Sequence, residues 1–269
     1  MASDMDTPQA ELIACCVASY DHPAVRWVLG DSWHPGGLPL TTRLAEAAGV
    51  GTQSRVLDAG SGRGATAVHL AKTVGCRVVG VTLEPGGTAV ADDLARHQGV
   101  EERTTFVQGD LMDAALEGER FDAVLMECVL SILSDKPAAL RGLYGLLRPG
   151  GRIGLTDVTV SGALPDELQG LLAVVGCVGN ARSLEEYGGL LAGAGFAVET
   201  AVDLPETATA FLKDLGGKLM LAEIAAKLGK LPVGGDVLVE AKRLLTAARD
   251  LVSRGALSYG MVVATKPEA

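Results

Sequence analysis

The chain has 269 residues, 48% of them hydrophobic, and 23 Lys and Arg against 33 Asp and Glu give a formal net charge of -10. This length predicts one elaborated domain, and the acidic balance without a basic cluster argues against a nucleic-acid partner. An acidic start and the lack of a long apolar run predict a cytoplasmic chain with no membrane partner. Five cysteines cannot all pair within the chain, so we expect free thiols.

Short β-branched runs alternate with amphipathic stretches through the first half of the chain. We expect strands at 54–60, 76–83, 104–110 and 121–129, and helices at 64–75 and 86–100. This alternation is typical of parallel strands joined by helices that cover both faces of a sheet.

The second half continues the alternation. We expect a helix at 136–147, closed by RPGG, and a second at 183–196, opened by a capping box of Ser183 and Glu186. The remaining strands are expected at 152–158, 197–204 and 257–266. Residues 206–257 are expected to be helical, with a Gly/Pro break at 229–236.

These elements predict an α/β fold, a Rossmann-like doubly wound and mainly parallel seven-stranded sheet with helices on both faces. We divide the chain into an N-terminal helical or lid segment at 1–50, a main domain at 51–202 plus 257–269, and a helical insertion at 203–256. The insertion precedes the last strand and could cap a site or form the face of a homodimer, although packing alone also explains its amphipathic stretches.

The stretch VLDAGSGRG joins the first expected strand to the first helix. Gly60, Gly62 and Gly64 allow a tight bend and a close approach of the backbone to a ligand. Such a turn alone is shared with dinucleotide-binding proteins. Asp58, just before the glycines, favours a cationic amino-acid group over a pyrophosphate. Asp110 ends the third strand at the same edge, where it could accept a hydrogen bond from an adenine amino group.

From about Arg55 to Val160, the chain resembles the class I S-adenosylmethionine-dependent methyltransferases. The motifs VLDAGSGRG, VVGVTL, VQGD, FDAVLMECV and LLRPGG occur in that family's order and spacing. The resemblance implies S-adenosylmethionine as the cofactor, methyl transfer as the reaction, and no metal. The residues that it implies for the cofactor are Asp58, Gly60, Ser61 and Gly62 at the methionine and ribose, Thr82 and Leu83 after the second strand, Asp110 and Leu111 at the adenine, and Glu127 near the methyl group.

The ribose contact departs from the pattern of many relatives. They carry an acidic residue at the end of the second strand, where this chain has Thr82, and Glu84 follows two residues later. The group that holds the ribose therefore stays open.

Four cysteines extend the resemblance to the arsenite methyltransferases. Cys15 and Cys16 match an ACC element near the N-terminus, Cys128 a cysteine after the fourth strand, and Cys177 one before a SLEEY-like helix. Cys76 matches nothing and is expected in the core. The resemblance implies a small acceptor held by thiols, either arsenite or its monomethyl form.

Thiol chemistry is compatible with such an acceptor. Trivalent arsenic is thiophilic, and thiolates would hold it with its lone pair projecting as the nucleophile. Because that nucleophile carries no proton, alignment and the exclusion of water would supply most of the acceleration.

One feature favours a different acceptor. Arsenite methyltransferases usually carry a further cysteine in a YGCG-like stretch, where this chain has LGDSWHPGG. His34 in that stretch could instead be the general base of a lid with aromatic walls over an organic substrate of the quinone, sterol or natural-product type. A third possibility is a cofactor-binding scaffold without catalysis.

Overall fold

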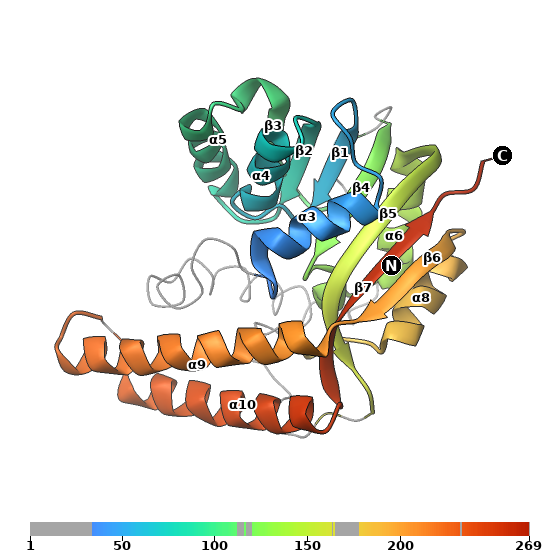
Figure 1. Ribbon diagram of the computed structural model, residues 1–269. Helices are drawn as coiled ribbons and strands as arrows, with labels where there is room; N and C mark the ends of the chain where they lie inside the picture. The colour runs from blue at the N-terminus through green and yellow to red at the C-terminus, as the bar shows by residue number, and fades with distance from the viewer. Residues whose placement is uncertain are drawn as a thin grey trace, which may run out of the picture.

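A single seven-stranded sheet organises the chain, in the strand order β3-β2-β1-β4-β5-β7-β6 (Figure 1). The computed structural model describes residues 34–111, 116, 120–162, 164, 178–231 and 233–268. The strands are β1 (Arg55–Ala59), β2 (Arg77–Thr82), β3 (Thr104–Gln108), β4 (Phe121–Glu127), β5 (Leu147–Val160), β6 (Ala197–Asp203) and β7 (Leu257–Thr265). β7 runs antiparallel to both of its neighbours, and the other pairs are parallel.

Helices cover both faces of the sheet. They are α3 (Gly37–Ala47), α4 (Ala65–Thr73), α5 (Gly87–Gln98), α6 (Lys136–Leu146), α8 (Leu184–Gly193), α9 (Pro205–Lys227) and α10 (Gly235–Ser253), with 3-10 turns η1 (Glu101–Arg103) and η2 (Leu130–Ile132). One core cluster joins α3 and α4 to the sheet, and another joins α6 and α8 to it. The expected doubly wound α/β fold is confirmed.

Alternate residues of the strands enter the two clusters. Val56 packs with the α3 and α4 side and Leu57 with the α6 and α8 side. Because both faces are covered, both sets are apolar and the strands read as nearly continuous hydrophobic runs. The two helices with the clearest sequence signals begin where expected: Ser183 forms a capping box with Glu186, and Asp135 caps α6 by accepting from the Ala138 N–H.

The largest difference from expectation is the start of the fifth strand. β5 begins at Leu147, which pairs with Phe121, and so includes the RPGG stretch that was expected to lie before it. The register shifts between Phe121 and Ala123, and Gly150 has a φ of 76°. The start of β5 is therefore irregular and contains Pro149, Gly150 and Gly151, although Pro and Gly usually end a helix or a strand.

The helices α9 and α10 form a hairpin between β6 and β7, on the side of the carboxyl ends of the parallel strands (Figure 1). Leu219, Ala222 and Leu245 are among the residues that give the hairpin its own apolar cluster. At its base the Ser161 N–H, just past β5, donates to the Ala256 carbonyl. Within the described residues, no helix is long and apolar enough to cross a membrane.

Candidate active site

The turn after β1 is fixed to the neighbouring strand. The backbone N–H groups of Gly60 and Ser61 both donate to the Val81 carbonyl, at 3.0 and 2.8 Å. Asp58 precedes this turn near the carboxyl end of β1. In an open α/β sheet, ligands bind outside these carboxyl ends, so the turn is placed to line a site.

Two glycines of the turn serve different purposes. Gly60 has a φ of 89°, and a Cβ there would lie 2.4 Å from the Val129 Cγ2, so this position admits no side chain in the folded protein. Gly62 also has a positive φ, 51°, but a Cβ there would meet nothing closer than the Glu84 Oε2 at 3.9 Å. The open space beside Gly62 is what a ligand approaching the backbone requires.

Asp58 is a buried carboxylate with unsatisfied bonding capacity. Its side chain is 3% exposed, and Oδ2 has no hydrogen-bond partner among the described residues. Burial, followed by the negative charge of Glu127, raises the pKa of the Asp58 carboxyl to about 8. The Ser61 hydroxyl is likewise buried without a partner in the described part of the chain. Buried polar groups in folded proteins are normally paired, so these two atoms fit a polar ligand that approaches this turn.

The end of β2 brings a second carboxylate to the same turn. The Thr82 hydroxyl accepts from the Glu84 N–H at 3.0 Å and so fixes the turn that carries Glu84. The Glu84 side chain pairs with the Arg63 Nε at 2.6 Å and is buried. Leu83, between them, is 42% exposed at this edge of the sheet.

The end of β3 lies beside the end of β2. The Gly109 N–H donates to the Thr82 carbonyl at 2.9 Å, which brings Asp110 and Leu111 to this edge. The sequence-predicted cofactor residues on β1, β2 and β3 therefore lie along one edge of the sheet.

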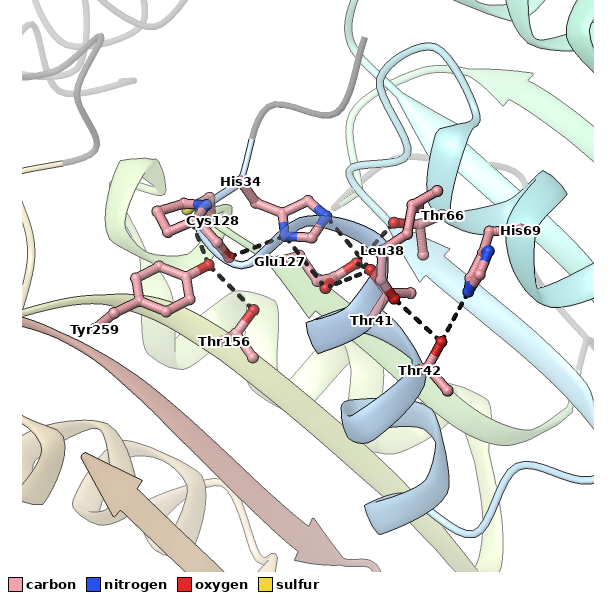
Figure 2. Close-up of polar contacts among 11 residues, drawn as sticks. His34, Leu38, Thr41, Thr42, Thr66, His69, Glu127, Cys128, Thr156 and Tyr259 are labelled. Carbon is pink, nitrogen blue, oxygen red and sulfur yellow. Dashed lines mark hydrogen bonds and ion pairs between the residues drawn. The ribbon is translucent and has the colours of Figure 1, made fainter. Parts of the chain in front are cut away.

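Glu127 ends β4 and is surrounded by hydrogen-bond donors (Figure 2). The Thr41 hydroxyl donates to both carboxylate oxygens, at 3.0 and 3.1 Å, and the Thr66 hydroxyl donates to Oε2 at 2.7 Å. The His34 Nδ1 lies 3.6 Å from Oε1, and both side chains are almost fully buried. Thr41 comes from α3 and Thr66 from α4, so two helices orient the carboxylate.

His34 is thus positioned by the group that sequence reasoning placed near the methyl donor. Its Nε2 lies 3.4 Å from the Thr41 hydroxyl. The Glu127 carboxylate beside Nδ1 and the Thr41 hydroxyl beside Nε2 fix the orientation of the imidazole ring.

A second histidine, His69 on α4, contacts the threonine that follows Thr41 on α3. The His69 Nε2 lies 2.8 Å from the Thr42 hydroxyl (Figure 2), and burial lowers the pKa of His69. Neighbouring threonines of α3 therefore contact different partners, Thr41 the carboxylate and Thr42 this imidazole.

Cys128 follows Glu127 and adopts an unusual backbone conformation. Among the described residues it is the one residue other than glycine with a positive φ, 55°. Its N–H donates to the Thr156 carbonyl at 2.8 Å, and its Sγ lies 3.2 Å from the Tyr259 hydroxyl. Strained positions of this kind persist where the surroundings fix them and are enriched at functional sites.

A buried polar group supports the turn beyond Cys128. Asp157 on β5 accepts from the Ser131 N–H of η2 at 2.8 Å, and burial raises its pKa to about 6. The Lys136 Nζ donates to the carbonyls of Ser131 and Leu133, and burial lowers its pKa to about 8. These contacts hold the loop after β4 against β5 and are structural.

The structure brings together most of the sequence-predicted residues. Asp58, Gly60, Ser61, Gly62, Thr82, Leu83, Asp110, Leu111, Glu127, Cys128 and His34 all lie at the carboxyl edge of the sheet or at the start of α3. Cys15, Cys16 and Cys177 lie outside the described residues. Cys76 is fully buried in the core, as expected.

Sequence reasoning missed the partners of these groups. Thr41, Thr66 and Thr156 carry no motif that would have marked them. Tyr259 offered a weak signal, because a tyrosine on a buried apolar strand needs a hydrogen-bond partner for its hydroxyl.

Comparison with known proteins relates part of the chain to methyltransferases. Residues 56–151 match the family model described as a methyltransferase domain. The methyltransferase GfsG of Streptomyces halstedii is 31% identical over 173 residues, covering 63% of this chain and 62% of the relative. An arsenite methyltransferase of Halobacterium salinarum is 31% identical over 183 residues, covering 64% of this chain and 46% of the relative. The chain thus spans about half to three fifths of the length of these relatives.

The same fold is found in solved structures. Phosphoethanolamine N-methyltransferase 2 of Haemonchus contortus gives a TM-score of 0.73 in its complex with phosphomonomethylethanolamine and S-adenosylhomocysteine. Its complex with S-adenosyl-L-methionine gives a TM-score of 0.76. At 19% identity, that alignment covers 98% of this chain and 59% of the other. It establishes the arrangement of the sheet and helices.

Proposed function

Because the chain carries a methyltransferase domain of the class I S-adenosylmethionine-dependent family, we propose that it transfers a methyl group from this cofactor to a small acceptor. The observation that carries the proposal is the buried Oδ2 of Asp58 beside the glycine turn, which has no hydrogen-bond partner in the described part of the chain. A buried carboxylate at this edge is complementary to a cationic ligand. S-Adenosylmethionine supplies an amino group and a sulfonium, and its chemistry is the donation of the sulfonium methyl.

The residues present fit this cofactor. Asp58 Oδ2 and the Ser61 hydroxyl, which have no partner among the residues that the structure describes, can bond to its amino-acid part. The space beside Gly62 admits a close approach to the backbone. We assign the ribose to Glu84, because Thr82 is occupied in fixing the turn. Leu83 and Leu111 would then cover the adenine, and Asp110 would accept from its amino group.

For the acceptor we propose trivalent arsenic, as arsenite or its monomethyl form, held by thiols. Support comes from Cys128, which follows Glu127 at the carboxyl end of β4, and from the resemblance of Cys15, Cys16 and Cys177 to cysteines of the arsenite methyltransferases. A reducing compartment such as the cytoplasm keeps such thiols free.

Trivalent arsenic and thiolate sulfur are both soft, so they bond readily to each other. Each thiol that binds forms an arsenic–sulfur bond and breaks an arsenic–oxygen bond, and its proton leaves with the displaced hydroxide as water. A bound S-adenosylmethionine would supply the methyl group: the arsenic lone pair would form the new arsenic–carbon bond as the methyl–sulfur bond breaks. S-Adenosylhomocysteine would leave uncharged at sulfur, and the positive charge would pass to arsenic. Since no proton is removed in the methyl transfer, positioning is the main contribution of the protein.

A second candidate acceptor is an organic hydroxyl. The specific support is the 3.6 Å contact between the His34 Nδ1 and the Glu127 carboxylate, which orients a proton acceptor at the same edge. The match to the methyltransferase GfsG shows that the relatives of this chain are not all arsenite methyltransferases. In this reaction His34 would take the hydroxyl proton as the oxygen attacks the methyl group.

An acceptor screen by mass spectrometry separates the two candidates. Arsenite, monomethylarsonous acid and small phenols are each incubated with the protein and S-adenosylmethionine. We expect methylated arsenicals from the unmodified protein, none from Cys128→Ser, and nearly full arsenical turnover by His34→Ala. The opposite pattern, with a methylated phenol lost in His34→Ala and unaffected in Cys128→Ser, would establish the organic acceptor.

We also propose that the α9 and α10 hairpin forms a homodimer face. Its support is the set of exposed apolar side chains on α9, namely Met220, Leu221, Ile224 and Leu228. Their spacing places them on the face of α9 opposite the one that packs on α10. Sedimentation equilibrium should show a dimer that Leu221→Glu dissociates and that Arg96→Glu, exposed on α5 and outside the hairpin, leaves intact; a monomer at all concentrations would refute it.

A further inference from the structure

Tyr259 brings a hydroxyl from β7 to the acceptor side of the site. Its side chain is 1% exposed, and its Oη lies 3.2 Å from the Cys128 Sγ and 3.2 Å from the Thr156 Oγ1 (Figure 2). A buried tyrosine hydroxyl is paired because an unpaired one loses its hydrogen bonds to water without replacement. One of its partners here is the thiol that we propose as a ligand.

The main chain of Cys128 is held by the same neighbour. Its N–H donates to the Thr156 carbonyl, while the Thr156 hydroxyl accepts from Tyr259. Both the backbone and the sulfur of Cys128 are therefore fixed through β5 and β7. The left-handed conformation of Cys128 is costly for a residue with a Cβ, and this double attachment accounts for its persistence.

We propose that Tyr259 is a positioning residue that holds the Cys128 sulfur in the orientation from which it binds a thiophilic acceptor. This inference rests on the proposed function and deepens it. Tyr259 itself does not contact the reacting atoms; it acts through the sulfur.

A tyrosine hydroxyl suits the task because it can both accept and donate. While Cys128 is a thiol, its S–H can donate to Oη, and Oη donates to Thr156. Once the sulfur has lost its proton or is bonded to arsenic, Oη can turn and donate to it, and the Thr156 hydroxyl can donate in return. Burial raises the pKa of Tyr259 well above its usual value, so the hydroxyl keeps its proton throughout.

Tyr187 provides a matched control. It is also 1% exposed, and its hydroxyl donates to the Val158 carbonyl at 3.2 Å. It packs in the cluster of α6 and α8, whereas Tyr259 packs in the cluster of α3 and α4. Tyr187→Phe thus removes an equally buried hydroxyl from the other face of the sheet.

The first test measures alkylation of Cys128 by iodoacetamide, followed by peptide mass spectrometry so that the other cysteines do not contribute. The thiolate is the reactive form. We expect Tyr259→Phe to slow the reaction of Cys128 by about threefold to tenfold, the effect of losing one hydrogen bond, and to move its pH profile upward. The charged groups around this thiol, Glu127, His34 and Asp157, are unchanged in the variant.

The second test measures the affinity for monomethylarsonous acid and for S-adenosylmethionine. Tyr259→Phe should weaken the arsenical by a similar factor and leave the cofactor affinity unchanged, while Tyr187→Phe changes neither. Equal alkylation rates and pH profiles in the two variants would overturn the positioning role. If instead the unmodified protein binds no arsenical but Tyr259→Phe still slows alkylation, the arsenic acceptor fails and the positioning of Cys128 stands.

Thr156→Val keeps the test decisive if Tyr259→Phe does not fold. It removes the second partner of the hydroxyl and preserves the volume of the side chain. We expect a change in the same direction, about twofold, in alkylation of Cys128. No change in a folded Thr156→Val protein would contradict the proposal.

Discussion

The two halves of the site differ in how their polar groups are satisfied. On the cofactor side, at the ends of β1 and β2, Asp58 and Ser61 each bury an oxygen without a partner among the described residues. On the acceptor side, at the end of β4 and the start of β7, Glu127 accepts from two threonine hydroxyls, and the Cys128 sulfur contacts Tyr259. The first half thus offers polar atoms to a ligand, whereas the side chains of Glu127 and Cys128 already have protein partners.

This contrast teaches where each kind of substitution should act. Changes on the cofactor side remove complementarity to a ligand and should appear in binding. Changes on the acceptor side disturb a network that exists beforehand and should appear in turnover.

Asp58→Asn should have the largest effect, because it removes the buried charge that faces the cationic part of the cofactor. We expect S-adenosylmethionine affinity to fall by at least about a hundredfold, as for a buried charged partner. Isothermal titration calorimetry measures this directly. Asp93→Asn, an exposed carboxylate on α5, is the control and should bind normally. Unchanged binding by Asp58→Asn would show that the cofactor lies elsewhere.

Cofactor binding should also depend on pH. Since the Asp58 pKa is raised to about 8 in the unliganded protein, its carboxyl carries a proton below that pH, and a cationic ligand must displace it. Affinity should therefore rise with pH up to about 8, approaching tenfold per pH unit, with release of a proton. Calorimetry in buffers of different ionisation enthalpy counts that proton.

Two further results sharpen the pH prediction. Glu127→Gln removes a charge that raises the Asp58 pKa, so the rise in affinity should shift to lower pH. The unliganded protein should lose stability as pH rises from the ordinary Asp range through about 8, because the folded state binds this proton more tightly than the unfolded state does. A cofactor affinity independent of pH would refute the proton displacement.

Thr41→Val tests the acceptor side with a smaller expected effect. It removes one donor to Glu127, and we expect turnover to fall by about threefold to tenfold with little change in cofactor affinity. Thr42→Val is the neighbouring control, because Thr42 contacts His69 and the Leu38 carbonyl instead. Steady-state kinetics on both variants decides the question, and an equal loss in both would point to α3 packing.

Cys76→Ala should have the smallest effect on function. Cys76 is fully buried in the core, and burial raises its pKa to about 11, so it is an inert thiol. We expect the free energy of unfolding to fall by about 1–2 kcal/mol and turnover per folded molecule to stay the same. Denaturant titration and a rate measurement on the same sample check both; a specific loss of activity would contradict the core assignment.

The sequence predicted the sheet well because its signals are local. Strands and helices alternate along the chain as their hydrophobic patterns predict. The sequence around Ser183 and Glu186 predicts a capping box, and the structure contains it. The glycines predicted a tight turn after the first strand, and the structure has that turn, with positive φ at Gly60, Gly62 and Gly64. That this turn lines the cofactor site stays a prediction. The start of β5 was predicted less well, because Pro149 and the glycines after it usually end a structure and here form an irregular strand.

The acceptor side could be predicted only in part. Glu127 and Cys128 follow a strand and are visible in the sequence, but their partners lie on α3, α4, β5 and β7. Contacts between residues so far apart in the chain depend on packing and leave no spacing pattern. The left-handed conformation of Cys128 likewise results from its tertiary contacts and not from its residue type.

Product analysis with the purified protein, S-adenosylmethionine and monomethylarsonous acid tests the central claim most directly. The account predicts a methylated arsenical from the unmodified protein and none from Cys128→Ser, with the same cofactor affinity in both. Full arsenical turnover by Cys128→Ser would contradict it, as would methylation of a phenol by a protein that leaves every arsenical unchanged.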